Sequence, residues 1–164
     1  MSAQLCAAGS WGIGRTASVD LPHPWLRSLG ALVGSEGVAQ VAPYLTQGSQ
    51  RELRRVANLP QDWDGAGSAT PRPESVANAA FRLTELCRLA MAAGTWVPPH
   101  ISASEAGEIT FEWWNGARKL TLYFGDQDLE VLRSWGTDVD DEMELVRVSR
   151  AAELALAWAW LYGY

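Results

Sequence analysis

The residue types that could carry chemistry in this chain are two histidines, two cysteines and several spaced carboxylates. His100 follows two prolines and begins an alternating segment, so we expect it at the start of a strand. A catalytic histidine needs a nucleophile and an orienting group, and the sequence marks neither. Cys87 falls on the apolar stripe of a predicted helix, where a thiol is normally inert core. We therefore predict no catalytic residue, and keep as an alternative a small enzyme in which His100 acts with a strand carboxylate such as Glu112.

Metal and phosphate motifs are incomplete. The segment DWDG, residues 62–65, places two aspartates ahead of a glycine, as at the start of a calcium loop. A calcium-binding EF-hand loop also needs oxygen ligands at its positions 5 and 12, which here are Ala66 and Pro73. Neither histidine has a second ligand at zinc spacing, and the glycines at residues 9–14 lack the lysine of a phosphate-binding loop. We expect no metal and no cofactor. The loop is better interpreted as a structural joint, formed by Trp63, Asp64 and Gly65.

Helical periodicity indicates the elements that would position these residues. A weakly patterned helix follows Pro24, and residues 38–45 hold a short turn that Pro43 should break. A clearer helix is predicted with Ser49 as its N-cap, and Asn58 and Pro60 should end it. The clearest helix should begin near residue 71, with the hydroxyl of Ser68 or Thr70 as its N-cap. Charged side chains on its outer surface are interpreted as an ordinary solvent face.

After His100 the apolar residues alternate, which indicates strands. The pair Asn115-Gly116 is the strongest hairpin signal, since a type I′ turn needs positive φ at both central residues. With those two residues as the loop, Phe111 should lie opposite Leu120.

A second turn at residues 125–128 would place Phe124 opposite Leu129 and so extend the hairpin to a three-stranded meander. Segments 100–104 and 142–148 alternate well enough to add a strand on each side, and a last helix should follow Ser149.

The predicted fold class is therefore α+β: an antiparallel β-meander of three to five strands packed against a long helix and a C-terminal helix, with a helical or irregular N-terminal region. A chain of 164 residues suits one hydrophobic core. We expect residues 1–22 to be a flexible or irregular arm and residues 23–164 to be a single α+β domain. The start lacks a leader pattern, no run of about 18 apolar residues occurs, and the two cysteines are far apart, so we expect a cytoplasmic protein without membrane insertion.

The charge of the chain is unevenly distributed. Residues 61–164 carry eight basic and sixteen acidic side chains, whereas residues 1–60 carry five and three. Such a field repels phosphate backbones, so we expect no direct nucleic-acid binding and a protein partner with a basic surface. The densest acidic run consists of Asp138, Asp140, Asp141, Glu142 and Glu144.

Nine tryptophans are many for a chain of this length. The alternation directs Trp113 into the core, and helical spacing directs Trp158 toward the sheet. Trp114, Trp135 and Trp160 are candidates for exposure, and exposed aromatic rings make protein hot spots or sugar platforms. We include Trp114 and Trp135, with the acidic run, in the predicted partner-binding surface.

Residues 57–132 resemble a widespread bacterial family of small uncharacterised proteins. The resemblance rests on LPQDWDGAGSATPRPES, a WDGxGA-like loop ahead of a long helix, and on the meander segment EITFEWWNGARKLTLYF. It implies the fold but brings no assigned activity. The doubled Trp113-Trp114 and the extension beyond residue 135 depart from the family pattern.

These features together lead us to expect a non-catalytic protein-binding protein, acting as an inhibitor or neutralising partner in a bacterial toxin, defence or anti-defence setting, for example an anti-CRISPR-like one. A small-molecule or sugar-binding module with a platform at Trp114 and Trp135 is the alternative. A homo-oligomer also stays open, since an exposed meander edge can pair with its copy.

Overall fold

The computed structural model describes residues 36–163 of the chain. The predicted arm at residues 1–22 and the helical pattern after Pro24 lie outside this range. Its elements in chain order are α2 (Glu36–Ala57), α3 (Pro73–Ala92), β1 (His100–Ala103), β2 (Ile109–Asn115), β3 (Arg118–Phe124), β4 (Leu129–Ser134), β5 (Met143–Val148) and α4 (Ala151–Tyr162).

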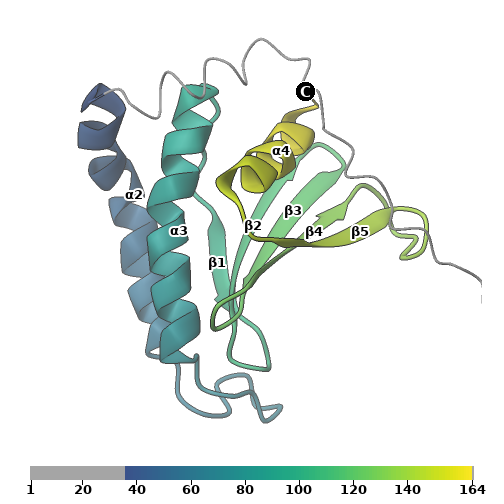
Figure 1. Ribbon diagram of the computed structural model, residues 1–164. Coiled ribbons are helices and arrows are strands. Elements are labelled where there is room, and N and C mark those ends of the chain that lie inside the picture. Colours follow the sequence, from purple (N-terminus) through teal and green to yellow (C-terminus); the bar gives the residue numbers. More distant parts are fainter. Residues whose placement is uncertain (1–35, 164) are drawn as a thin grey trace, which may run out of the picture.

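The strands form one sheet in the order β1-β2-β3-β4-β5, and each neighbouring pair is antiparallel. The helices pack on one face of this sheet, with α2 and α3 side by side and α4 over the strands (Figure 1). The structure therefore confirms the predicted α+β meander, including the two additional strands.

The face of the sheet that the helices cover, here called the helix face, carries the core. Ile109, Phe111 and Trp113 alternate along β2 and all three are buried. The ring of Trp113 meets that of Trp158 from α4 edge-on, with 5.2 Å between centroids. Both tryptophans are buried, as predicted from their spacing. The other side, here called the open face, is covered by no helix among the described residues.

The hairpin between β2 and β3 has a different register from the predicted one. Phe111 lies opposite Leu122 rather than Leu120, because the two-residue loop consists of Gly116 and Ala117. Among the described residues only glycines and Asp62 have positive φ, so Gly116 at +60° and Ala117 fit a type II′ turn, which needs glycine only at its first central position. A shift of two residues in the partner strand leaves every side chain on its predicted face.

Asn115 lies before the turn rather than in it, and a tertiary contact holds it there. It ends β2, and its Nδ2 donates a hydrogen bond to the Leu161 carbonyl of α4 at 3.0 Å. The second turn does follow prediction, with Phe124 opposite Leu129 and Leu122 opposite Val131.

The predicted break at Pro43 is wrong, since α2 continues through it. Ser49 is therefore not an N-cap but a buried residue inside the helix. A proline removes one amide donor from a helix. The hydroxyl of Thr46 donates to the Ala42 carbonyl at 3.0 Å, and Leu53 in the following turns packs into the core. Tertiary packing thus outweighs the local penalty.

The predicted caps of α3 are also wrong. The N-cap is Arg72, which makes no side-chain cap, and Pro73 begins the helix. The buried residue that fixes this end is Ser75. Its hydroxyl accepts a hydrogen bond from the Ile109 amide at 2.7 Å and donates one to the Phe124 carbonyl at 2.5 Å. One side chain thereby joins α3 to both β2 and β3.

Candidate functional site

The loop at residues 62–68 uses its carboxylates internally. Asp62 accepts a hydrogen bond from the Gly67 amide at 2.6 Å. Asp64 accepts bonds from the Ser68 hydroxyl and from the Ala66 amide, and these hold the pKa of the Asp64 carboxyl below its usual value. No group of three possible metal-ligating side chains occurs in the described part of the chain. In the described structure these two carboxylates therefore close their own loop.

The other two residues of the predicted structural joint have separate roles: Gly65 allows the turn of the loop, and Trp63 attaches the loop to the core. Gly65 has a φ of +74°, which an L side chain rarely adopts. Trp63 is partly buried and packs against the core, although its Nε1 atom is buried without a hydrogen-bond partner among the described residues. The loop is therefore held to the domain by apolar contact rather than by a polar bond from the indole.

Four of the five acidic-run residues, Asp138, Asp140, Asp141 and Glu142, lie in the loop between β4 and β5, and they have different surroundings. Glu142 accepts hydrogen bonds from the amides of Thr137 at 2.8 Å and Asp138 at 3.1 Å. Asp138 in turn accepts bonds from the amides of Asp140 at 3.0 Å and Asp141 at 3.3 Å. Asp138 and Glu142 thus build the loop. The exposed carboxylates of Asp140 and Asp141 have no hydrogen bond or ion pair with any described residue.

Glu144 lies beyond this loop on β5 and is already paired. Its carboxylate accepts a bond from Arg133, its register partner on β4, at 3.2 Å. Within the predicted acidic surface, only the carboxylates of Asp140 and Asp141 therefore form no hydrogen bond or ion pair with a described residue.

Trp135 lies at the base of the acidic loop, on the helix side of the sheet. Its amide donates to the Glu142 carbonyl at 3.0 Å, and its ring meets Trp160 of α4 with 5.9 Å between centroids. The guanidinium carbons of Arg118 and Arg133 lie 5.6 and 5.8 Å from the Trp160 centroid. Two cations therefore stabilise the ring on which Trp135 rests. Trp135 itself is 38% exposed.

Trp114 lies elsewhere. Its position on β2 alternates with buried Trp113, so it projects from the open face, where it is 56% exposed. The ammonium of Lys119 lies 5.2 Å from its ring centroid and the His100 ring 6.2 Å away. The sheet separates Trp114 from Trp135, so the structure does not form the predicted joint platform.

The histidine of the enzyme alternative does meet its expected carboxylate in the sheet. His100 on β1 is the register partner of Glu112 on β2. Glu112 is nevertheless engaged by others: it forms an ion pair with Lys119 and accepts a 3.5 Å contact from the Thr121 hydroxyl. No side-chain hydrogen bond joins the His100 imidazole to Glu112 or to another described residue. The pair is adjacent but not arranged as an oriented base.

The other nucleophile considered, Cys87, is buried, and burial raises the pKa of its thiol to about 11. A thiolate is the reactive form of cysteine, and this environment disfavours it at neutral pH.

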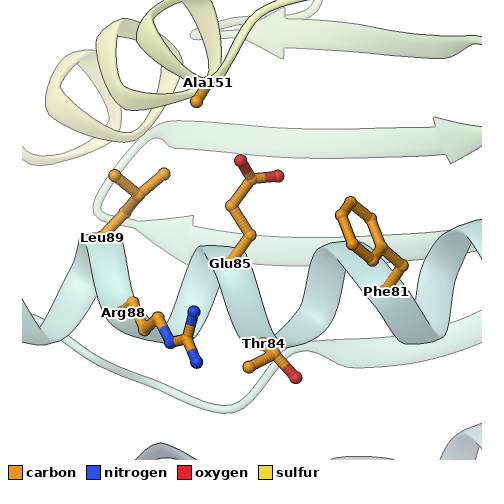
Figure 2. Close-up of a pocket in the computed structure, with 6 residues that line it drawn as sticks. All are labelled: Phe81, Thr84, Glu85, Arg88, Leu89 and Ala151. Carbon is orange, nitrogen blue, oxygen red and sulfur yellow. The ribbon is translucent and has the colours of Figure 1, made fainter. Parts of the chain in front are cut away.

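A cleft that no sequence pattern indicates lies between α3 and the start of α4. Its volume is about 450 Å³, and it is lined by Phe81, Thr84, Glu85, Arg88, Leu89 and Ala151. Figure 2 shows the side chains of Phe81, Glu85 and Leu89 rising from α3 on the side that faces Ala151. These α3 residues recur at helical spacing but mix apolar and charged types, and the sequence indicates only an ordinary solvent face for the charged ones, Glu85 and Arg88. Phe81, 70% exposed, was the signal that could have identified it.

Comparisons with protein-family models, curated proteins and solved structures found no match to this chain. The family resemblance of residues 57–132 therefore stays a prediction. Among the described helices, none combines the length and the apolar character needed to cross a bilayer.

Proposed function

We propose that the protein acts by binding another protein with a basic surface, through a site here called the loop surface, formed by Trp135, Asp140 and Asp141. The observation that carries the proposal is a half-exposed tryptophan, supported from below by Trp160, beside two carboxylates that no described residue engages. Tryptophan is enriched at binding hot spots, and unengaged rim charges steer and select a partner.

In its most specific form the proposal is an inhibitor or neutralising partner in a bacterial toxin, defence or anti-defence setting, for example an anti-CRISPR-like one. The proposal assigns the acidic contribution to Asp140 and Asp141, because these carboxylates can contact a partner without breaking the hydrogen bonds that close the loop. Asp138 and Glu142 shape the loop through backbone bonds, so their replacement would alter the surface indirectly.

Affinity capture from the native host, followed by mass spectrometry, tests the proposal. The variants are Trp135→Ala and the double variant Asp140→Asn, Asp141→Asn. A matched control, Glu74→Gln with Glu105→Gln, changes the net charge equally at exposed positions of α3 and the β1–β2 loop. A partner should be captured by the wild type and the control and lost with both loop variants.

For that partner, Trp135→Ala should weaken binding by about 30-fold or more, the level of a hot-spot truncation of about 2 kcal/mol. Equal capture by all four proteins would show that the loop surface is not the binding site.

The cleft between α3 and α4 supports a second candidate, a small-molecule binding module. Its volume of about 450 Å³ lies within the range of about 300–1,000 Å³ that ligand sites occupy. Titration with aromatic amines and aromatic carboxylates, followed by NMR of the Thr84 and Ala151 methyl groups, tests it. Saturable shifts in the wild type that vanish in Ala151→Leu, which fills the cleft, would support the module. No shift with either class would count against it.

A further inference from the structure

The described sheet has two edge strands, β1, which α2 contacts, and β5. Strand β5 pairs only with β4, and no described strand lies beyond it (Figure 1). In an antiparallel edge strand, alternate residues direct both their N–H and their C=O groups away from the sheet. These groups can accept another strand, which is the basis of peptide recognition by strand addition.

This edge carries few of the features that usually protect an edge strand. All six residues of β5 pair with β4 in unbroken register, without proline, glycine or a bulge. Leu145 is 59% exposed on the open face. Arg147 is charged but already forms ion pairs with Asp128 and Glu130 at 3.5 and 3.1 Å. A regular, partly apolar edge of this length is competent to pair.

A second copy of the chain fits this edge poorly. Two copies of β5 pairing antiparallel about a two-fold axis must place residues of the same face opposite each other. An axis at Leu145 sets Glu144 against Val146, and Met143 against Arg147. An axis at Val146 sets Leu145 against Arg147. Axes at Glu144 or Arg147 set like charges opposite each other. Each register therefore opposes a charge to an apolar residue or to its own kind.

A basic strand offers what no self-pairing register of the six β5 residues provides, a positive charge opposite Glu144. Asp140 and Asp141 precede β5, which begins at Met143, by only two or three residues, so they lie near the end of the edge at which an added strand would begin or end. Glu144 faces the helix side and is half exposed despite its bond to Arg133, so a lysine opposite it would gain a second ion pair. Leu145 on the open face would meet an apolar residue. The favoured segment thus alternates basic and apolar side chains.

We propose that the protein binds its partner by adding an extended, basic segment of that partner to β5 as a sixth strand. The inference rests on the proposed function and specifies how the partner reaches the loop surface. Main-chain hydrogen bonds along β5 would supply affinity, and Asp140, Asp141 and Glu144 would select a basic sequence.

The test uses the full chain and a fluorescent ten-residue peptide of alternating lysine and valine, measured by anisotropy. A glutamate–valine peptide is the charge control. Two further peptides are N-methylated on all lysines or on all valines, because in a strand these two sets of amides point to opposite edges. The parent peptide should bind. One methylated peptide should lose at least tenfold in affinity while the other keeps most of it, and the glutamate–valine peptide should not bind.

Amide hydrogen exchange on the same complex supplies a second readout. Alternate amides within Met143–Val148 should exchange at least tenfold more slowly when the parent peptide is bound, whereas the amides bonded to β4 should change little. Absence of peptide binding, or equal affinity of both methylated peptides, would overturn strand addition. Strand addition would also be overturned if light scattering showed that the protein is a dimer and its β5 amides were protected before any peptide was added.

The peptide test separates the two proposals. If both methylated peptides bind equally but Asp140→Asn, Asp141→Asn weakens them, the loop surface stands and strand addition fails. The other outcome is that the asparagine variant binds the parent peptide as tightly as the wild type does, that the glutamate–valine peptide binds as tightly as the parent, and that the two methylated peptides differ in affinity. The edge then binds strands without the proposed preference for basic partners.

Discussion

Replacing Ser75 with alanine should destabilise the fold more than any other single hydroxyl removal considered for this chain. The Ser75 hydroxyl accepts from the Ile109 amide at 2.7 Å and donates to the Phe124 carbonyl at 2.5 Å. Ile109 and Phe124 are both fully buried, so water cannot replace the lost partner without entering the core. An orphaned buried donor costs about 1–3 kcal/mol, and the second lost bond adds about 1 kcal/mol. We expect a loss of about 3 kcal/mol in the free energy of unfolding.

Urea unfolding followed by tryptophan fluorescence measures this loss. With an m-value of about 2 kcal/mol/M, the midpoint should fall by about 1.5 M. Ser102→Ala is the matched control, since its hydroxyl bonds only the Thr110 hydroxyl, at 2.6 Å, on the open face. That variant should lose about 1 kcal/mol or less. If the two variants had the same midpoint, the interpretation of Ser75 as the fastener between α3 and the sheet would be refuted.

Three further predictions follow from individual side chains. Asp64→Asn should remove part of the acid sensitivity of the fold. Because the pKa of the Asp64 carboxyl is lowered in the folded state, its contribution to the free energy of unfolding is complete above about pH 4 and is lost as the pH falls through the folded-state pKa. The urea midpoints of wild type and variant should therefore converge at low pH. In a Cys6→Ser background, the Cys87 thiol should resist alkylation by iodoacetamide at pH 7.5 and should react at the rate of a free thiol only in urea. Rapid labelling of the folded protein would contradict the burial of Cys87 and its pKa of about 11. Asn115→Ala should cost about 1 kcal/mol in urea unfolding through loss of the bond to Leu161, whereas an unchanged midpoint would show that the hairpin end is not held by α4.

The sequence predicted those parts of the fold that depend on local periodicity. Alternation placed Trp113 in the core, and turn residues placed Phe124 opposite Leu129, because both signals act over a few residues. The hairpin loop was misplaced by one residue because Asn115 bonds a carbonyl of α4, a contact 46 positions away that no local pattern contains. The continuation of α2 through Pro43 likewise depends on packing against α3 and β1.

The candidate site was less predictable for a related reason. The sequence could identify an acidic run, but it could not distinguish Asp138 and Glu142, which bind loop amides, from Asp140 and Asp141, which are unengaged among the described residues. Such distinctions depend on how a loop closes in space. The α3–α4 cleft was missed because its second wall comes from residue 151, on a helix far from α3 in sequence.

The position of the two exposed tryptophans limits how one partner could use them. A strand added to β5 extends the sheet sideways and leaves both faces accessible, but its side chains reach only the rows next to β5. Trp135 follows β4 directly and stands on the helix side, at the end of the sheet where the acidic loop joins β4 to β5. Trp114 lies on β2, three strands away and on the open face. Its ring is held between Lys119 and His100, contacts that need no partner. A segment bound at the edge therefore lies nearer to Trp135 than to Trp114, and a partner that depended on both rings would have to contact both faces of the sheet.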